Sequence, residues 1–162
     1  MPLLGAIVGG TAREDHVAEL SCSCGERRVP GSSEDLRVLV VDDHPMVRTA
    51  LAETLSDADD VTVVGECEDG SLVVEAVSRL RPDVVLMDFS MPVMNGLAAT
   101  EALRAAELHS PVVVLTSANS VERGTVAAAG GDALVLKTAR ADALVHCLRT
   151  VVVGCGCCPF CL

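Results

Sequence analysis

The sequence Asp83-Val84-Val85-Leu86-Met87-Asp88-Phe89-Ser90-Met91-Pro92 is an apolar run that ends in a carboxylate and a turn, and it gives the first indication of the fold. Three other apolar runs end in a polar residue in the same way. Residues 36–41 precede Asp42-Asp43, residues 111–115 precede Thr116-Ser117, and residues 133–136 precede Lys137. Continuous aliphatic runs of this length are typical of parallel strands buried on both faces. Since the carboxyl ends of parallel strands share one edge, these polar residues are predicted to meet.

Helical patterns alternate with these runs along the chain. We predict helices over 45–56, 71–80, 96–107, 120–129 and 139–150, and a further strand over 61–65. Pro45 suits the first position of a helix, where its missing N–H costs nothing. Alternating strands and helices predict an α/β fold with a doubly wound, five-stranded parallel sheet, in the flavodoxin-like order 2-1-3-4-5, flanked by five helices.

The patterned region covers residues 35–153 and has the size of one domain. Residues 1–34 have no sustained period and are predicted to be a flexible N-terminal extension. Residues 154–162 carry no charge and form a Cys-rich C-terminal tail, which contains Cys155, Cys157, Cys158 and Cys161.

Charge and hydropathy exclude some classes of function. The formal net charge of −11 argues against direct nucleic-acid binding, which needs a basic face. No uninterrupted apolar stretch approaches the ~20 residues that span a bilayer. Phe89 and Phe160 are the only aromatic residues, so the core must be built from Val, Leu and Ala. We expect a cytoplasmic protein with no membrane association.

The predicted meeting point has the chemistry of a phosphate-handling acid pocket. Asp42, Asp43 and Asp88 would repel one another unless a cation neutralised them. Hard oxygen ligands of this kind suit Mg²⁺, which shares itself with phosphoryl groups. An ionised Asp can also be a nucleophile and form an aspartyl phosphate. Lys137 could stabilise charge on phosphoryl oxygens, and the Thr116 hydroxyl could bind one of them.

Three segments carry a resemblance to a known family: residues 40–48 (VVDDHPMVR), residues 85–96 (VLMDFSMPVMNG) and Leu136-Lys137. They resemble the receiver domain of bacterial response regulators, the CheY-like family. The Asp-Asp-His-Pro start is similar to the NarL/LuxR-type subfamily, whose receivers usually precede a helix-turn-helix output domain. We expect no such output domain within this sequence.

The resemblance implies roles for the pocket residues. Asp88 would be the phosphoacceptor, with a sensor histidine kinase as partner and phosphoryl donor. Mg²⁺ would be bound directly by Asp43, through water by Asp42, and also by Asp88 and the Ser90 backbone carbonyl. The protein would be a phosphorelay component that assists its own phosphorylation and dephosphorylation, and not an enzyme that turns over a small molecule.

The resemblance also implies a conformational switch. Thr116 would move toward the phosphoryl group, and Lys137 would supply its counter-charge. A homodimer would form through the face of the fourth helix, fifth strand and fifth helix, or through the first and fifth helices. Leu134 stands where the family has a switch aromatic, and the segment containing Gly124 is one residue shorter than usual.

Two other classes of function remain open from the residues. One is a receiver-like interaction module that does not switch. The other is a metal- or redox-sensing protein that uses the terminal cysteines, since Cys158 and Cys161 have the Cys-x-x-Cys spacing and Cys22 and Cys24 could complete a thiolate set. An unstructured end is a third interpretation of the tail.

Overall fold

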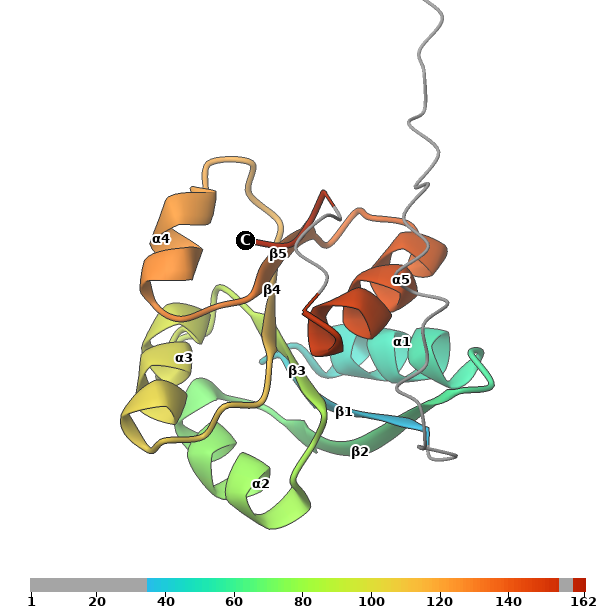
Figure 1. The fold of residues 1–162 in the computed structure, drawn as a ribbon, viewed down its shortest axis with the longest axis horizontal. Coiled ribbons are helices and arrows are strands. Elements are labelled where there is room, and N and C mark those ends of the chain that lie inside the picture. Colours follow the sequence, from blue (N-terminus) through green and yellow to red (C-terminus); the bar gives the residue numbers. More distant parts are fainter. Residues whose placement is uncertain (1–34, 155–158) are drawn as a thin grey trace, which may run out of the picture.

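A computed structural model describes residues 35–154 and 159–162, which include a parallel sheet between two layers of helices (Figure 1). The strands are β1 (Leu36–Val41), β2 (Val61–Cys67), β3 (Val84–Asp88), β4 (Val112–Thr116) and β5 (Ala133–Leu136). The helices are α1 (Pro45–Ser56), α2 (Val73–Leu80), α3 (Gly96–Ala105), α4 (Arg123–Ala128) and α5 (Ala141–Val152), with a 3₁₀ turn, η2 (Gly70–Leu72), directly before α2.

The sheet has the order β2-β1-β3-β4-β5 with every pair of neighbouring strands parallel. This confirms the predicted doubly wound fold and its strand order. β1 and β3 are neighbours although α1, β2 and α2 lie between them in sequence. Their carboxyl ends therefore lie side by side at the switch point of the sheet, where ligands bind in such folds.

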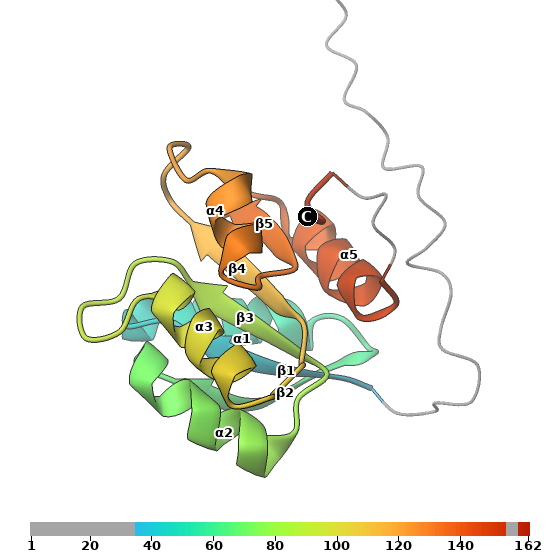
Figure 2. The same ribbon diagram turned by 60° about the vertical axis from the view of Figure 1, so that its left-hand side comes forward.

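Alternate residues of the central strands face two separate hydrophobic layers. Val38, Val84 and Leu86 pack with α1 and α5 on one face of the sheet. Leu39 and Val85 pack with α2, α3 and the buried side of α4 on the other. Figures 1 and 2 show the same division, with α1 and α5 on the opposite side of the sheet from α2 and α3. The aliphatic core predicted from the scarcity of aromatic residues is confirmed.

Several helix ends differ from the predicted positions. The fourth helix was predicted over 120–129 but covers 123–128, a short helix that includes Gly124, a poor helix former. α3 stops at Ala105 because Glu107 adopts the left-handed conformation (φ 57°). α5 runs two residues later than predicted, since the Ala139 N–H closes a turn onto the Leu136 carbonyl. The second helix was predicted from residue 71, but Ser71 and Leu72 belong to η2, and α2 itself starts at Val73.

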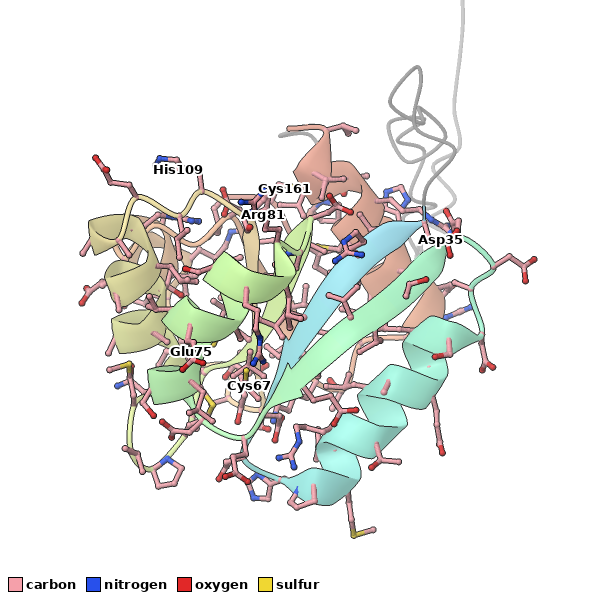
Figure 3. The ribbon with its side chains drawn as sticks, turned by 90° about the horizontal axis from the view of Figure 1, so that it is seen from below. Asp35, Cys67, Glu75, Arg81, His109 and Cys161 are labelled. Carbon is pink, nitrogen blue, oxygen red and sulfur yellow. The ribbon has the colours of Figure 1, made fainter. Side chains whose placement is uncertain are left out.

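Of the predicted terminal segments, residues 1–34 and Cys155, Cys157 and Cys158 lie outside the described residues, as do Cys22 and Cys24. The last residues are described, and Cys161 pairs with Ala133 in an antiparallel bridge at the outer edge of β5. Cys67 is buried at the end of β2, at the end of the sheet opposite Asp35 (Figure 3). Among the described residues, no helix is both long and apolar enough to cross a bilayer.

Candidate functional site

Asp42, directly after β1, is the most constrained carboxylate of the site. Its side chain is fully buried, and each oxygen accepts one hydrogen bond. Oδ1 accepts from the His44 backbone N–H at 2.9 Å, and Oδ2 accepts from Lys137 Nζ at 2.6 Å. The first bond fixes the turn between β1 and α1, and the second ties this turn to the end of β5.

Arg48 holds the same turn from α1. Its Nη1 donates to the backbone carbonyl of Asp42 at 2.6 Å, and its Nε lies 3.5 Å from a carboxylate oxygen of Glu66 on β2. The sequence gives no indication of this role for Arg48. A bond to a backbone carbonyl has no spacing signature, and only the motif that carried the family resemblance included Arg48.

Asp88 ends β3 and is 3 % exposed. Its Oδ1 lies 3.0 Å from Lys137 Nζ and accepts a long hydrogen bond of 3.4 Å from the Ser90 N–H. Burial raises the pKa of the Asp88 carboxyl above its usual range; the Lys137 ammonium opposes this effect and the Asp42 carboxylate reinforces it. The carboxylate is thus partly desolvated, which suits a group that must react with an incoming electrophile.

Lys137 follows β5 and is the chain's only lysine. Burial lowers the pKa of its ammonium, but the bonds to Asp42 and Asp88 outweigh burial, so its pKa is raised above the ordinary value. Lys137 therefore stays charged throughout the physiological pH range. The single ammonium of Lys137 pairs with the two buried carboxylates of Asp42 and Asp88, so the site keeps a net negative charge.

Asp43 adds a third carboxylate to the site. Its Oδ1 lies 2.8 Å from His44 Nδ1, but not with hydrogen-bond geometry, so this buried oxygen accepts no hydrogen bond from the described residues. Ligand atoms of Asp42, Asp43, His44 and Asp88 all lie within 4.8 Å of one another. An unsatisfied oxygen in a group of hard donors with surplus negative charge fits a small divalent cation such as Mg²⁺.

Thr116 ends β4 and is almost fully buried. Its hydroxyl accepts a 3.1 Å bond from the Ala118 N–H and lies 3.4 Å from the Ala118 carbonyl, so it belongs to the turn after the strand. The Thr116 carbonyl accepts from the Lys137 N–H at 2.8 Å, which joins the ends of β4 and β5. Thr116 thus lies next to the acid group without bonding to its carboxylates.

The loop that follows Asp88 is held closely against β3. The Gly96 N–H donates to the Phe89 carbonyl at 3.0 Å, and a Cβ on Gly96 would lie 2.3 Å from the Asp88 carbonyl oxygen. Asp69, which caps η2, accepts a 3.3 Å bond from the Met94 N–H in the same loop. Burial by itself would raise the pKa of the Asp69 carboxyl, but the hydrogen bonds that it accepts from the Ser71 and Met94 N–H groups lower it. Ser90, exposed at the start of the loop, is positioned beside the acid group.

The structure therefore brings together Asp42, Asp43, Asp88 and Lys137, the residues predicted at the ends of β1, β3 and β5. Ser90 and Thr116 lie at the border of this group. The side chain of His44, next to Asp43, is 67 % exposed. The chemical roles assigned to these residues remain predictions.

Comparisons with known proteins agree with this geometry. A family model described as the response regulator receiver domain matches residues 38–149. The nitrate/nitrite response regulator NarL of Escherichia coli is 36 % identical over 124 residues, which cover 76 % of this chain and 57 % of NarL. The transcriptional regulatory protein LiaR of Bacillus subtilis is 40 % identical over 121 residues, which cover 74 % of this chain and 57 % of LiaR. The chain thus spans less than two thirds of the length of these relatives.

Solved structures of receiver domains are also similar to this chain. The signal receiver domain of NarL from Mycobacterium tuberculosis has a TM-score of 0.68 at 32 % identity and covers 75 % of this chain and 98 % of that one. The response regulator domain of CheB from Thermotoga maritima has a TM-score of 0.68 at 26 % identity, and the match covers 74 % of this chain and 98 % of that domain. On the family match, the sequence identities and the shared fold, this chain belongs to the response regulator receiver domain family.

Proposed function

We propose that Asp88 accepts a phosphoryl group from a sensor histidine kinase, and that Mg²⁺ binds beside it during the transfer. The observation that carries this proposal is the arrangement around Lys137 Nζ, which lies 2.6 Å from Asp42 and 3.0 Å from Asp88. This ammonium orients the Asp88 carboxylate and would lie next to the oxygens of an attached phosphoryl group. Phosphoryl transfer depends mostly on such positioning and charge neutralisation.

The cation would be held by Asp43, by Asp42 through water, by Asp88 and by the Ser90 carbonyl. When bound, it would neutralise charge on the carboxylates and on the transferred group. The chain's own residues carry out the transfer itself. An Asp88 carboxylate oxygen attacks phosphorus as the bond to the donor breaks, Lys137 stabilises the phosphoryl oxygens, and Arg48 keeps the Asp42 turn in place.

Thr116 would report the phosphorylated state. Its hydroxyl bonds only weakly within its own turn, at 3.1 and 3.4 Å, so exchanging these contacts for a phosphoryl oxygen costs little. The Thr116 carbonyl bonds to the Lys137 N–H, so a shift at β4 reaches β5 directly. The phosphoryl group would bias an equilibrium between two arrangements of this region.

We propose that the receiver domain covers residues 35–153, lies in the cytoplasm and acts as a phosphoacceptor without turnover of a small molecule.

Of the two faces predicted for a homodimer, the α1–α5 face has an apolar hollow of about 340 Å³, which is lined by Ala50, Leu51 and Leu144 among others. Met46 at its border is 86 % exposed. An exposed apolar side chain beside an apolar hollow supports association through this face.

Incubation with acetyl phosphate followed by intact-mass spectrometry tests the proposal. We expect one phosphoryl adduct that requires Mg²⁺, disappears in Asp88→Asn and persists in Asp59→Asn, a matched change at an exposed carboxylate. An adduct that persists in Asp88→Asn, or no adduct in the folded wild-type protein with Mg²⁺, would contradict it.

A further inference from the structure

The outer edge of β5 is covered by the chain's own last residues. β5 is one of the two edge strands of the sheet, so its outward N–H and C=O groups need a partner or water. The Leu134 N–H donates to the Phe160 carbonyl at 3.0 Å, and the Leu162 N–H donates to the Asp132 carbonyl at 3.0 Å. These two bonds flank the antiparallel bridge between Ala133 and Cys161 and add a short strand to the sheet. In Figures 1 and 2 the C-terminus lies beside β5, between α4 and α5.

Arg123, the first residue of α4, binds the side of this short strand that faces away from β5. Its guanidinium donates to the Pro159 carbonyl at 2.8 Å and also to the Cys161 carbonyl. Alternate carbonyls of the strand thus bond to Arg123, while the Phe160 carbonyl bonds to β5. Both sides of the segment's backbone are recognised, as in complexes where an extended peptide adds to a sheet edge.

The side chain of Phe160 gives the segment an apolar anchor. It is partly buried and packs against the hydrophobic layer formed by α1, α5 and the sheet. Pro159 and Phe160 line a groove of about 540 Å³ that also includes Leu134, Leu136 and Thr116. The groove therefore extends from the C-terminal segment to the end of β4, beside the acid group.

We propose that the β5 edge is a strand-addition surface, that its occupant is the chain's own segment Pro159–Leu162, and that loading of the acid site alters how this segment is seated. The coupling rests on the proposed function, while the occupancy does not. The path from the acid site to the segment is short. Lys137 directly follows the last residue of β5, and its N–H donates to the Thr116 carbonyl at the end of β4. Within β5, the Leu134 N–H donates to the Phe160 carbonyl of the segment. An extended apolar peptide of a partner could bind the same edge only by displacing the segment, so the segment restricts access to this face.

The two phenylalanines permit a direct test on the full chain. Labelling with 4-fluorophenylalanine gives two ¹⁹F resonances, one from Phe89 beside Asp88 and one from Phe160 in the segment that pairs with β5, and Phe160→Leu assigns them. We expect Arg123→Ala to move the Phe160 resonance toward the position of the free amino acid and to leave Phe89 unchanged. The matched control is Arg140→Ala, which removes an exposed arginine of the same groove that pairs with Asp142. It should move neither resonance.

Amide exchange gives a second measure of occupancy. Deletion of residues 159–162 should speed exchange of the Leu134 N–H at least tenfold and leave the Lys137 N–H, which bonds to β4, unchanged. Unchanged Leu134 exchange, or an unmoved Phe160 resonance in Arg123→Ala, would overturn the occupancy. A Phe160 resonance that depends on protein concentration would mean that a second copy supplies the segment, and would overturn occupancy within one chain.

Addition of Mg²⁺ with beryllofluoride, a phosphoryl mimic, tests the coupling. We expect both ¹⁹F resonances to shift. If Phe89 shifts and Phe160 does not, the acid site binds the mimic and the coupling is wrong. If neither resonance shifts, the acid site does not bind the mimic, and both the proposed function and the coupling are wrong. The binding of Pro159–Leu162 at the β5 edge is still tested by Arg123→Ala.

Discussion

Lys137 Nζ donates a 2.6 Å hydrogen bond to Asp42 Oδ2, although 95 positions separate the two residues in the sequence. The bond joins the ends of β1 and β5, which are not neighbours in the sheet. The acid site is therefore complete only after β1, β3, β4 and β5 have paired. This long-range contact makes the site sensitive to changes in any of the strands that lie between.

Replacement of Lys137 by alanine should weaken both stability and phosphorylation. Without divalent metal, two buried carboxylates lose their counter-charge, which costs on the order of 3 kcal/mol of unfolding free energy. Mg²⁺ should restore part of this loss. Urea titration with and without Mg²⁺ measures the effect, and Arg79→Ala, at an exposed position on α2, should have none. Equal stability of Lys137→Ala and wild type in the absence of metal would refute the role of the ammonium.

Asp88→Asn should stabilise the metal-free protein in a pH-dependent way. Burial raises the pKa of the Asp88 carboxyl, so the native state holds this proton more strongly than the unfolded chain. The wild-type protein therefore loses stability as pH rises from the unfolded value of about 3.9 through the native pKa. Asparagine removes this loss, so the advantage of the variant should grow with pH and shrink when Mg²⁺ is added.

Denaturant unfolding over a pH series in EDTA measures this advantage. Asp142→Asn is a control of opposite sign, because Arg140 lowers the pKa of the Asp142 carboxyl in the native state. Its stability relative to wild type should fall slightly as pH rises. A pH-independent difference for Asp88→Asn would mean that burial does not perturb this carboxyl.

Two glycine substitutions should have opposite effects. A Cβ at Gly96 would lie 2.3 Å from the Asp88 carbonyl oxygen, so Gly96→Ala must displace the loop after β3 and should reduce both stability and phosphorylation. A Cβ at Gly124 in α4 would enter open space, with nothing within 4 Å, so Gly124→Ala should stabilise the protein by about 0.4–1 kcal/mol. Thermal unfolding and acetyl phosphate labelling of both variants check these signs, and a stabilised, fully active Gly96→Ala would be incompatible with the loop described.

Arg48→Ala should weaken Mg²⁺ binding without removing any proposed ligand. The variant releases the Asp42 carbonyl and the turn that carries Asp42 and Asp43. We expect about tenfold weaker binding, or ~1.4 kcal/mol, by calorimetric titration. Arg79→Ala, at an exposed position on α2, should bind Mg²⁺ as wild type does. Unchanged affinity in Arg48→Ala would show that the turn holds its shape without the arginine.

The sequence predicted the sheet and its order because the strands are buried on both faces and therefore appear as unbroken aliphatic runs. The predicted meeting of Asp42, Asp88 and Lys137 follows from the same fact, since residues after parallel strands share one edge. Helix ends were less predictable. The start of α4 at Arg123 and the end of α3 at Ala105 depend on local turns, such as the left-handed Glu107, that no apolar period encodes.

Other features depend on tertiary contacts that the sequence does not reveal. Arg48 acts on a carbonyl, and any arginine near the start of α1 would look the same in the sequence. The segment Pro159–Leu162 has no strand-like alternation, yet it pairs with β5 because an edge strand offers unpaired backbone groups to whatever chain is near. Its position could be learned only from the folded molecule.

The position of the phosphoryl group tests the proposed phosphoacceptor most directly. After incubation with acetyl phosphate and Mg²⁺, reduction with borohydride converts an aspartyl phosphate to homoserine, and peptide sequencing by mass spectrometry locates it. We predict homoserine at position 88 and at no other aspartate. Homoserine at Asp42 or Asp43, or none in folded protein, would contradict the assignment of Asp88.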